Sequence, residues 1–248
     1  MRFFAVTVLG LLMTGPAFSQ TIITAPPKGD SPDYRPILLG RGPNALINRI
    51  DVQDLVKKGQ KNAGIMFCCL VKKNGEMTWS GTYRGTPDSK VLEQELQKLL
   101  GPASNLKFIP AIYNGHPVDA VYFGTVIFAI KDNKPHLRIF SNQETAELER
   151  ESDFIGPQPF FGYDSEFRGL HYPPESEAPV SVEGVADIQM SVDEKGNLQR
   201  IALVAEEPPL LGFGNAVLSD FRKAKFIPAF RDGKPVACQV RLPVYYKP

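Results

Sequence analysis

Histidines and cysteines are the residues of this 248-residue chain that could bind a metal ion or act as nucleophiles. His116, His136 and His171 lack the His-Glu-x-x-His spacing of a zinc site, and no Cys-x-x-Cys pair is present. Each histidine has a structural explanation, because the first lies in a predicted turn, the second at a strand start and the third before Tyr172-Pro173. We therefore expect neither a metal nor another cofactor.

Nucleophiles and carboxylates form no recognisable catalytic motif. The sequence contains neither the Gly-x-Ser-x-Gly turn of serine hydrolases nor a phosphate-binding loop. Cys68 lies in a predicted apolar strand, where burial would raise the thiol pKa. Gly212-Phe213-Gly214 precedes a predicted helix and could bind an anion, but a loop turn explains it better. Glu206-Glu207 is best explained as a solvated loop. The alternative, two acids brought together by folding, would make the chain a hydrolase of an envelope polymer.

A repeat gives the first indication of the fold. The string Lys-Phe-Ile-Pro-Ala occurs at residues 107–111 and again at residues 225–229. Each copy is preceded by one Gly turn and followed by another, and the second turn leads into a Pro-Val pair. The turns are Asn74-Gly75 and Asn114-Gly115 in the first copy, and Lys195-Gly196 and Asp232-Gly233 in the second. Shared turns in the same order predict a duplicated module.

Hydrophobic periodicity predicts the same order of elements in both copies, which is strand, strand, helix, strand. The first copy has predicted strands at 64–72, 76–83 and 118–130 and a helix at 87–100; the second has strands at 186–192, 198–204 and 236–246 and a helix from Asn215 to about residue 225. The fold class is therefore α+β, with two tandem strand-strand-helix-strand modules, each a small antiparallel sheet packed on one helix.

The first predicted sheet is apolar on both faces, so it needs two covering layers. One helix can cover one face, and the second cover must come from the other copy, another chain or the connecting segment. The connecting segment has a predicted strand at 136–140, a short helix at 144–151 and an aromatic cluster of Phe160, Phe161, Tyr163 and Phe167. Packing between domains explains this cluster better than a binding surface.

The N-terminus has the pattern of an export signal. Arg2 is followed by an apolar run over residues 3–13, by Gly15-Pro16 and by Ala17-Phe18-Ser19, which predicts cleavage after Ser19 and a periplasmic or secreted protein. The formal charge of +1 gives no reason to expect nucleic acid. The predicted organisation is a signal peptide at 1–19, a flexible leader at 20–45, a first module at 46–140, a connector at 141–171 and a second module at 172–248.

The second copy resembles the C-terminal domain of TonB-type proteins. The similarity is carried by Tyr172-Pro173, Glu183-Gly184-Val185, the turn at residues 192–196, Phe226-x-Pro228-Ala229 and residues 232–236. It implies that the last strand lies at a sheet edge and binds a partner peptide as an added strand. The implied binding residues are Val236, Cys238, Gln239, Val240, Arg241, Leu242, Val244 and Tyr245. The first copy, at about residues 50–128, is similar mainly in the repeated string and turns.

These patterns predict an exported, non-enzymatic protein of the cell envelope that acts through protein contacts. The partner would be an envelope protein or peptide, for which an outer-membrane transporter is one candidate, and the first module would anchor the assembly or form a homodimer. Energy transduction is not expected, because the signal is cleavable and the leader is short. The alternatives are the hydrolase described above and a structural envelope component.

Overall fold

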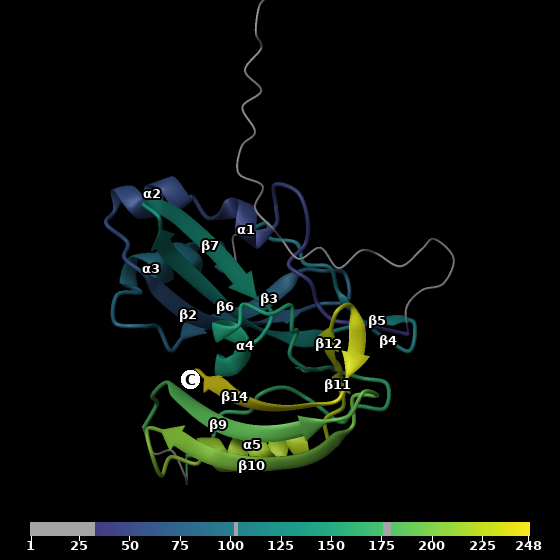
Figure 1. Cartoon of the computed structure of the whole chain (residues 1–248). Coiled ribbons are helices and arrows are strands. Elements are labelled where there is room, and N and C mark those ends of the chain that lie inside the picture. The colour runs from purple at the N-terminus through teal and green to yellow at the C-terminus, as the bar shows by residue number, and fades with distance from the viewer. Residues whose placement is uncertain (1–32, 102–103, 176–179) are drawn as a thin grey trace, which may run out of the picture.

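The computed structural model describes residues 33–101, 104–175 and 180–248. The predicted signal peptide and residues 20–32 of the predicted leader lie outside this range. The fold is α+β, as predicted, and its two main sheets are antiparallel. In Figure 1 the sheet of the second half lies below that of the first, and the last strand lies on the side nearer to the first half.

The first half contains a four-stranded sheet in the order β3-β2-β6-β7. Its strands are β2 (Ala63–Val71), β3 (Met77–Tyr83), β6 (Ala120–Lys131) and β7 (Lys134–Phe140). Helix α3 (Lys90–Leu99) packs against β2 and β3, and the short helices α1 (Leu46–Arg49) and α2 (Val52–Lys57) contact β7. Helix α3 begins three residues after Pro87, because the Thr86 hydroxyl binds the Gly64 N–H instead of capping a helix.

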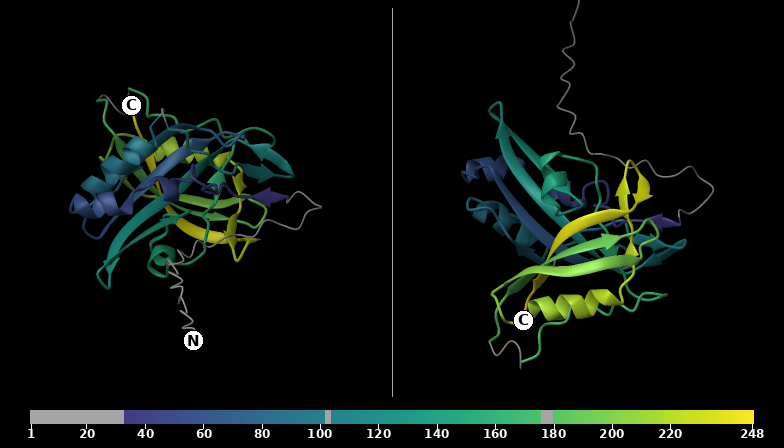
Figure 2. Two further views of the ribbon diagram at one scale, coloured as in Figure 1. Left: turned by 90° about the horizontal axis from the view of Figure 1, so that it is seen from above. Right: turned by 60° about the horizontal axis from the view of Figure 1, so that its bottom comes forward.

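The second half contains a three-stranded sheet in the order β10-β9-β14. Its strands are β9 (Gly184–Val192), β10 (Leu198–Glu207) and β14 (Cys238–Tyr246), and its helix is α5 (Phe213–Arg222). The right panel of Figure 2 shows α5 on the face of this sheet that is turned away from the first half. Helix α5 begins before the predicted cap Asn215, at a point where the Glu206 carboxylate accepts the Gly214 N–H at 2.6 Å.

Short elements complete the chain. One small hairpin precedes β6 in the first half and another precedes β14 in the second: β4 (Ala111–Tyr113) with β5 (His116–Val118), and β12 (Ala229–Arg231) with β13 (Lys234–Val236). The others are β1 (Tyr34–Arg35), which pairs with β4, β8 (Gln158–Pro159), which pairs with β11 (Phe226–Ile227), and α4 (Thr145–Glu149).

The repeated string and the repeated turns contact each other in the same way in both halves. The turn glycine of each first hairpin has a positive φ, +82° at both Gly75 and Gly196. Its carbonyl accepts the N–H of the string's phenylalanine, from Phe108 at 3.0 Å in the first half and from Phe226 at 2.9 Å in the second. In both halves the first strand of the module lies between the second strand and the strand that follows the helix and the small hairpin: β2 lies between β3 and β6, and β9 lies between β10 and β14. The repeated residues therefore have one structural role, which is to join the first hairpin to the segment after the helix.

Both faces of the first sheet are buried, and the cover of each face can be named. On one face Phe67 and Cys69 pack in a core with Leu92 and Leu96 of α3. On the other, Cys68, Tyr83 and Phe123 pack with Tyr245 of β14 and with Phe154 and Phe167 of the connector. The second cover thus comes from the other copy and from the connecting segment of the same chain. The apolar face that suggested a homodimer through the first module is covered within the chain.

The structure changes the prediction for the leader and adds detail to that for the aromatic cluster of the connector. The predicted leader boundary at residue 45 is too late, because Tyr34 and Arg35 already pair with β4 and Ile37 is fully buried. The Ile37 N–H donates to the side chain of the equally buried Gln158 at 2.7 Å. In the aromatic cluster of the connector, Phe160 and Phe167 are fully buried, whereas Tyr163 is exposed and stacks on His116. Packing therefore accounts for most of the cluster.

Candidate partner-binding edge

Strand β14 is an edge strand of the second sheet, and its pairing with β9 is regular. Nine consecutive pairs run from Cys238↔Val192 to Tyr246↔Gly184 without a register shift. The opposite edge strand, β10, has two register shifts against β9, between Leu198 and Arg200 and between Leu203 and Ala205. Bulges of this kind interrupt the ladder that an added strand needs. Of the two edge strands, β14 is therefore the one with the uninterrupted ladder that strand addition needs.

The eight predicted binding residues differ in exposure. Gln239 and Arg241 are exposed, Val236 and Cys238 are partly buried, and Val240, Leu242, Val244 and Tyr245 are buried. Val236 belongs to the short strand β13 and not to β14. The buried positions 240, 242 and 244 lie opposite the β9 residues that pack on α5, so they belong to the core of the second half. The two exposed side chains of β14, those of Gln239 and Arg241, both lie in its first four residues.

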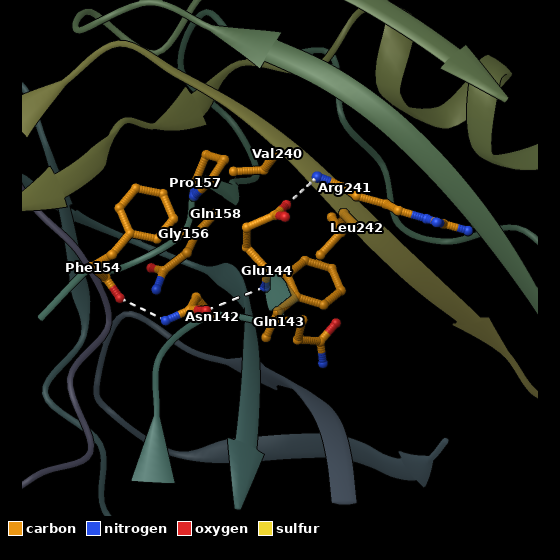
Figure 3. Close-up of a pocket in the computed structure, with 11 residues that line it drawn as sticks. Asn142, Gln143, Glu144, Phe154, Gly156, Pro157, Gln158, Val240, Arg241 and Leu242 are labelled. Atoms are coloured by element: carbon orange, nitrogen blue, oxygen red, sulfur yellow. Dashed lines mark hydrogen bonds between the residues drawn. The ribbon is translucent and has the colours of Figure 1, made fainter. Parts of the chain in front are cut away.

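Backbone groups on the outer side of β14 are partly occupied by the chain itself, as Figure 3 shows. The Arg241 N–H donates to Oε2 of Glu144 at 2.6 Å. Because backbone groups alternate in direction along a strand, the N–H groups of Gln239 and Tyr245 also point away from β9. Pro243 has no N–H, and its carbonyl accepts from the Tyr83 hydroxyl at 3.1 Å. Residues 241–243 thus have no vacant outward N–H for an added strand, whereas Gln239 has one.

The C-terminal part of β14 lies in the contact between the two halves. The Tyr245 ring stacks on the Tyr83 ring with a centroid distance of 5.1 Å and an interplanar angle of 7°. Strand β3 approaches so closely that a Cβ built on Gly81 would lie 2.5 Å from Cε1 of Tyr245. Burial in this contact raises the pKa of the Tyr245 hydroxyl above its ordinary value. Strand addition along residues 243–246 would require the first half to move away.

A small pocket lies beside the beginning of β14. Its lining includes the apolar residue Phe123. Phe154, Pro157, Glu144 and Arg241 also line it, and Figure 3 shows these four around it. Glu144 is the one carboxylate in its lining. The pocket therefore lacks the pair of acids that the hydrolase alternative requires.

Two buried amides hold the segment that carries Glu144. The Asn142 side chain donates to the Phe154 carbonyl at 2.8 Å and accepts the Glu144 N–H at 3.2 Å. The Gln143 side chain donates to the carbonyls of Phe67 and Gly124, each at 3.1 Å. Its Oε1 also lies 2.9 Å from the Tyr83 hydroxyl. These contacts fix the backbone before Glu144, because buried amides that lose their partners are costly.

One ion cluster links the two halves next to the same edge. Asp187 of β9 is buried, and its two carboxylate oxygens accept from different arginines, Arg84 at 2.5 Å and Arg241 at 2.8 Å. The side chain of Arg241 is 55% exposed and that of Arg84 is 33% exposed. Two guanidinium groups thus share one carboxylate, and the carboxylate of Glu144 on the Arg241 N–H is a second negative charge at this edge.

The other residues that could act as nucleophiles or metal ligands have structural roles. Burial raises the pKa of both neighbouring thiols, Cys68 and Cys69, and raises that of Cys238 to about 11. His171 binds the carboxylate of Asp220 through its ring nitrogen at 2.7 Å and its backbone N–H at 2.9 Å. Within the described residues, no group of three or more His, Cys, Asp or Glu side chains could hold a metal ion.

Sequence reasoning did not find the partners of β14. Glu144, Tyr83 and Asp187 come from three different segments, and only the packing of the two halves brings them to this edge. The useful signal was Pro243, because a proline within a strand indicates an edge whose N–H side faces away from the sheet. That signal supports an edge position without naming what lies against it.

Comparison with known proteins bears on the second half of the chain. Residues 168–248 match the family described as the Gram-negative bacterial TonB protein C-terminal. The C-terminal part of the chain is TonB C-terminal domain-like. The matched range includes β9, β10, α5 and β14, so the TonB C-terminal domain-like part contains the candidate edge and its helix. This part of the chain is thus similar to protein-interaction modules of the cell envelope.

The match does not extend to the first half, whose relation to the second rests on the repeat and on the shared sheet order. No curated protein and no solved structure matches the chain. Within the described residues, no helix is long and apolar enough to cross a membrane.

Proposed function

We propose that this chain is an exported, non-enzymatic protein of the periplasm that captures an extended segment of an envelope protein at the outer edge of β14. The observation that carries the proposal is a regular edge strand whose exposed beginning lies in the TonB C-terminal domain-like part. An outer-membrane transporter is one candidate for the partner. Backbone hydrogen bonds would provide affinity, and alternate side chains would provide selectivity.

The segment would pair first with Cys238 to Arg241. There the Gln239 N–H points outwards, and its side chain and that of Arg241 are exposed on the face opposite α5. Pairing beyond residue 241 is restricted by Pro243 and by the Tyr83 hydroxyl. We therefore expect a short added strand of about four residues, bound more weakly than one that spans all of β14.

We also infer that the two halves descend from one duplicated module, with the division into residues 46–140, 141–171 and 172–248. The shared sheet order and the matching contacts of Gly75 and Gly196 support this inference. In the proposed function the first half supports β14, because it covers the end of that strand and places Glu144 at its outer edge.

Affinity capture with the tagged mature protein tests the proposal. Gln239→Pro removes an outward N–H, whereas Gln239→Ala keeps it and serves as the matched control. A proline at residue 240 is less suitable, because the Val240 N–H points towards β9 and its loss would weaken the sheet itself. We expect the alanine variant to recover the partners of the wild type from envelope extract and the proline variant to lose them. Equal recovery by both variants would show that β14 does not bind by strand addition.

A further inference from the structure

Glu144 occupies the position at β14 that a partner's hydrogen-bond acceptor would take. We propose that the captured segment carries a carboxylate side chain that binds the Arg241 N–H, and that Glu144 holds this place in the free chain. The proposal rests on the proposed function, because it names the chemistry of the segment that β14 would bind. Its basis is the 2.6 Å hydrogen bond from the Arg241 N–H to the Glu144 carboxylate.

The contact differs from an ordinary strand ladder. In a ladder, the outward N–H of Arg241 would donate to a backbone carbonyl of the neighbouring strand. Here a charged side chain accepts it, next to a pocket lined by the apolar residues Phe154 and Pro157 (Figure 3). A hydrogen bond to a carboxylate is shorter and stronger than one to a neutral carbonyl. A partner that offers only carbonyls would therefore compete poorly with Glu144.

The Glu144 side chain can leave without unfolding its surroundings. Its backbone follows the anchored residues Asn142 and Gln143, which are both buried and hydrogen-bonded through their side chains. Glu144 itself is only partly buried. Rotation of this one side chain would free the Arg241 N–H and open the pocket, while the anchored segment stays in place.

Charge favours an acidic occupant. Arg84 and Arg241 share the single carboxylate of Asp187, so Glu144 supplies the second negative charge at this edge. Once Glu144 turns away, two arginines face one acid. A carboxylate on the partner would restore the balance, whereas a lysine there would increase the excess.

Two synthetic peptides with blocked ends provide the probes: Thr-Val-Glu-Val-Thr, and the same sequence with Gln in place of Glu. Binding to the full-length mature protein is measured by titration calorimetry for the wild type, for Glu144→Ala and for the control Glu149→Ala. Glu149 is exposed and lies at the other end of α4. We expect the acidic peptide to bind Glu144→Ala about tenfold more tightly than it binds the wild type or the control. We also expect Glu144→Ala to bind the acidic peptide about tenfold more tightly than the Gln peptide. One charged hydrogen bond decides each comparison.

Hydrogen exchange of the Arg241 amide checks the free state. Glu144→Ala should increase its exchange rate about tenfold relative to the wild type, and Glu144→Gln, which keeps an acceptor, should increase it less. Unchanged exchange of the β9 amides shows that the variants are folded. Equal binding of the two peptides, absence of binding by both, or an Arg241 amide that exchanges alike in all variants would overturn this proposal. The proposed function is judged separately, by the envelope capture with Gln239→Pro.

Discussion

Replacement of Gly196 by alanine tests whether the repeated string and the repeated turn depend on each other. Gly196 has a φ of +82°, and a Cβ built there would lie 1.8 Å from the Phe226 carbonyl oxygen. An L-residue in this backbone region costs about 1–2 kcal/mol. The Phe226 carbonyl must also move away from the added Cβ. Movement of Phe226 breaks the 2.9 Å hydrogen bond from its N–H to the Gly196 carbonyl, which costs about 1 kcal/mol more. We therefore expect a loss of about 2–3 kcal/mol in the free energy of unfolding.

Two further variants make this prediction specific. Gly75→Ala should lose a comparable amount, because its Cβ would lie 2.3 Å from the Phe108 carbonyl oxygen at the same φ. Gly115→Ala has a φ of +76° with no atom within 4 Å of the added Cβ, so it should lose only the backbone cost of about 1–2 kcal/mol.

Urea denaturation followed by circular dichroism measures all three glycine variants against the wild type. The reasoning would be refuted if Gly196→Ala and Gly75→Ala lost no more stability than Gly115→Ala. That result would mean that the turn and the string can separate at little cost, and the repeat would then need another explanation.

Four smaller predictions follow from single contacts. Asp187→Asn should lower the free energy of unfolding by about 2 kcal/mol in urea denaturation, because a buried carboxylate that accepts from two arginines becomes neutral. Tyr83→Phe should lower it by about 1 kcal/mol in the same assay, through loss of the hydroxyl between Gln143 and the β14 edge. Because burial raises the pKa of Cys238 to about 11, its reaction with a thiol reagent should be slow at pH 8 and accelerate about tenfold per pH unit up to that pKa. The hydrogen bond from Arg231 lowers the pKa of Glu147 below 4.5. This pair therefore stabilises the fold above pH 4.5, and its contribution is lost as pH falls through the folded pKa. Glu147→Gln should flatten the acid limb of a plot of the free energy of unfolding against pH.

The sequence predicted the features that depend on local pattern. Alternating residues such as Phe67 and Cys68 placed side chains on opposite faces of β2, and the structure has these two residues in different cores. The repeat predicted the order of elements in both halves, because turns and periodicity are local signals. The need for a second cover on the first sheet was also inferred from sequence, although the source of that cover stayed open.

Features that depend on contacts between distant segments could not be predicted. The helix boundary before α3 was placed too early, because Thr86 binds the Gly64 N–H across the sheet instead of capping a helix. The flexible leader was extended too far, since Ile37 is anchored by Gln158, which lies 121 residues later in the chain. Glu144 was missed at the site for the same reason, because a glutamate at the start of a short predicted helix gives no local sign of a backbone partner 97 residues away.

The two edges of the second sheet differ in what limits strand addition. On β10 the limit is in the strand itself, where two register shifts interrupt the ladder. On β14 the ladder is regular, and the limit comes from the first half, through the Tyr83 hydroxyl at Pro243 and the stacked pair of Tyr83 and Tyr245. Exposing all of β14 would require the first half to move away, which would uncover one apolar face of the first sheet, including the fully buried Cys68. Burial of this face stabilises the fold by more than a few added backbone hydrogen bonds would. Capture at the first four residues of β14 needs only that Glu144 turn away, so it is the lower-energy route for a partner to reach this edge.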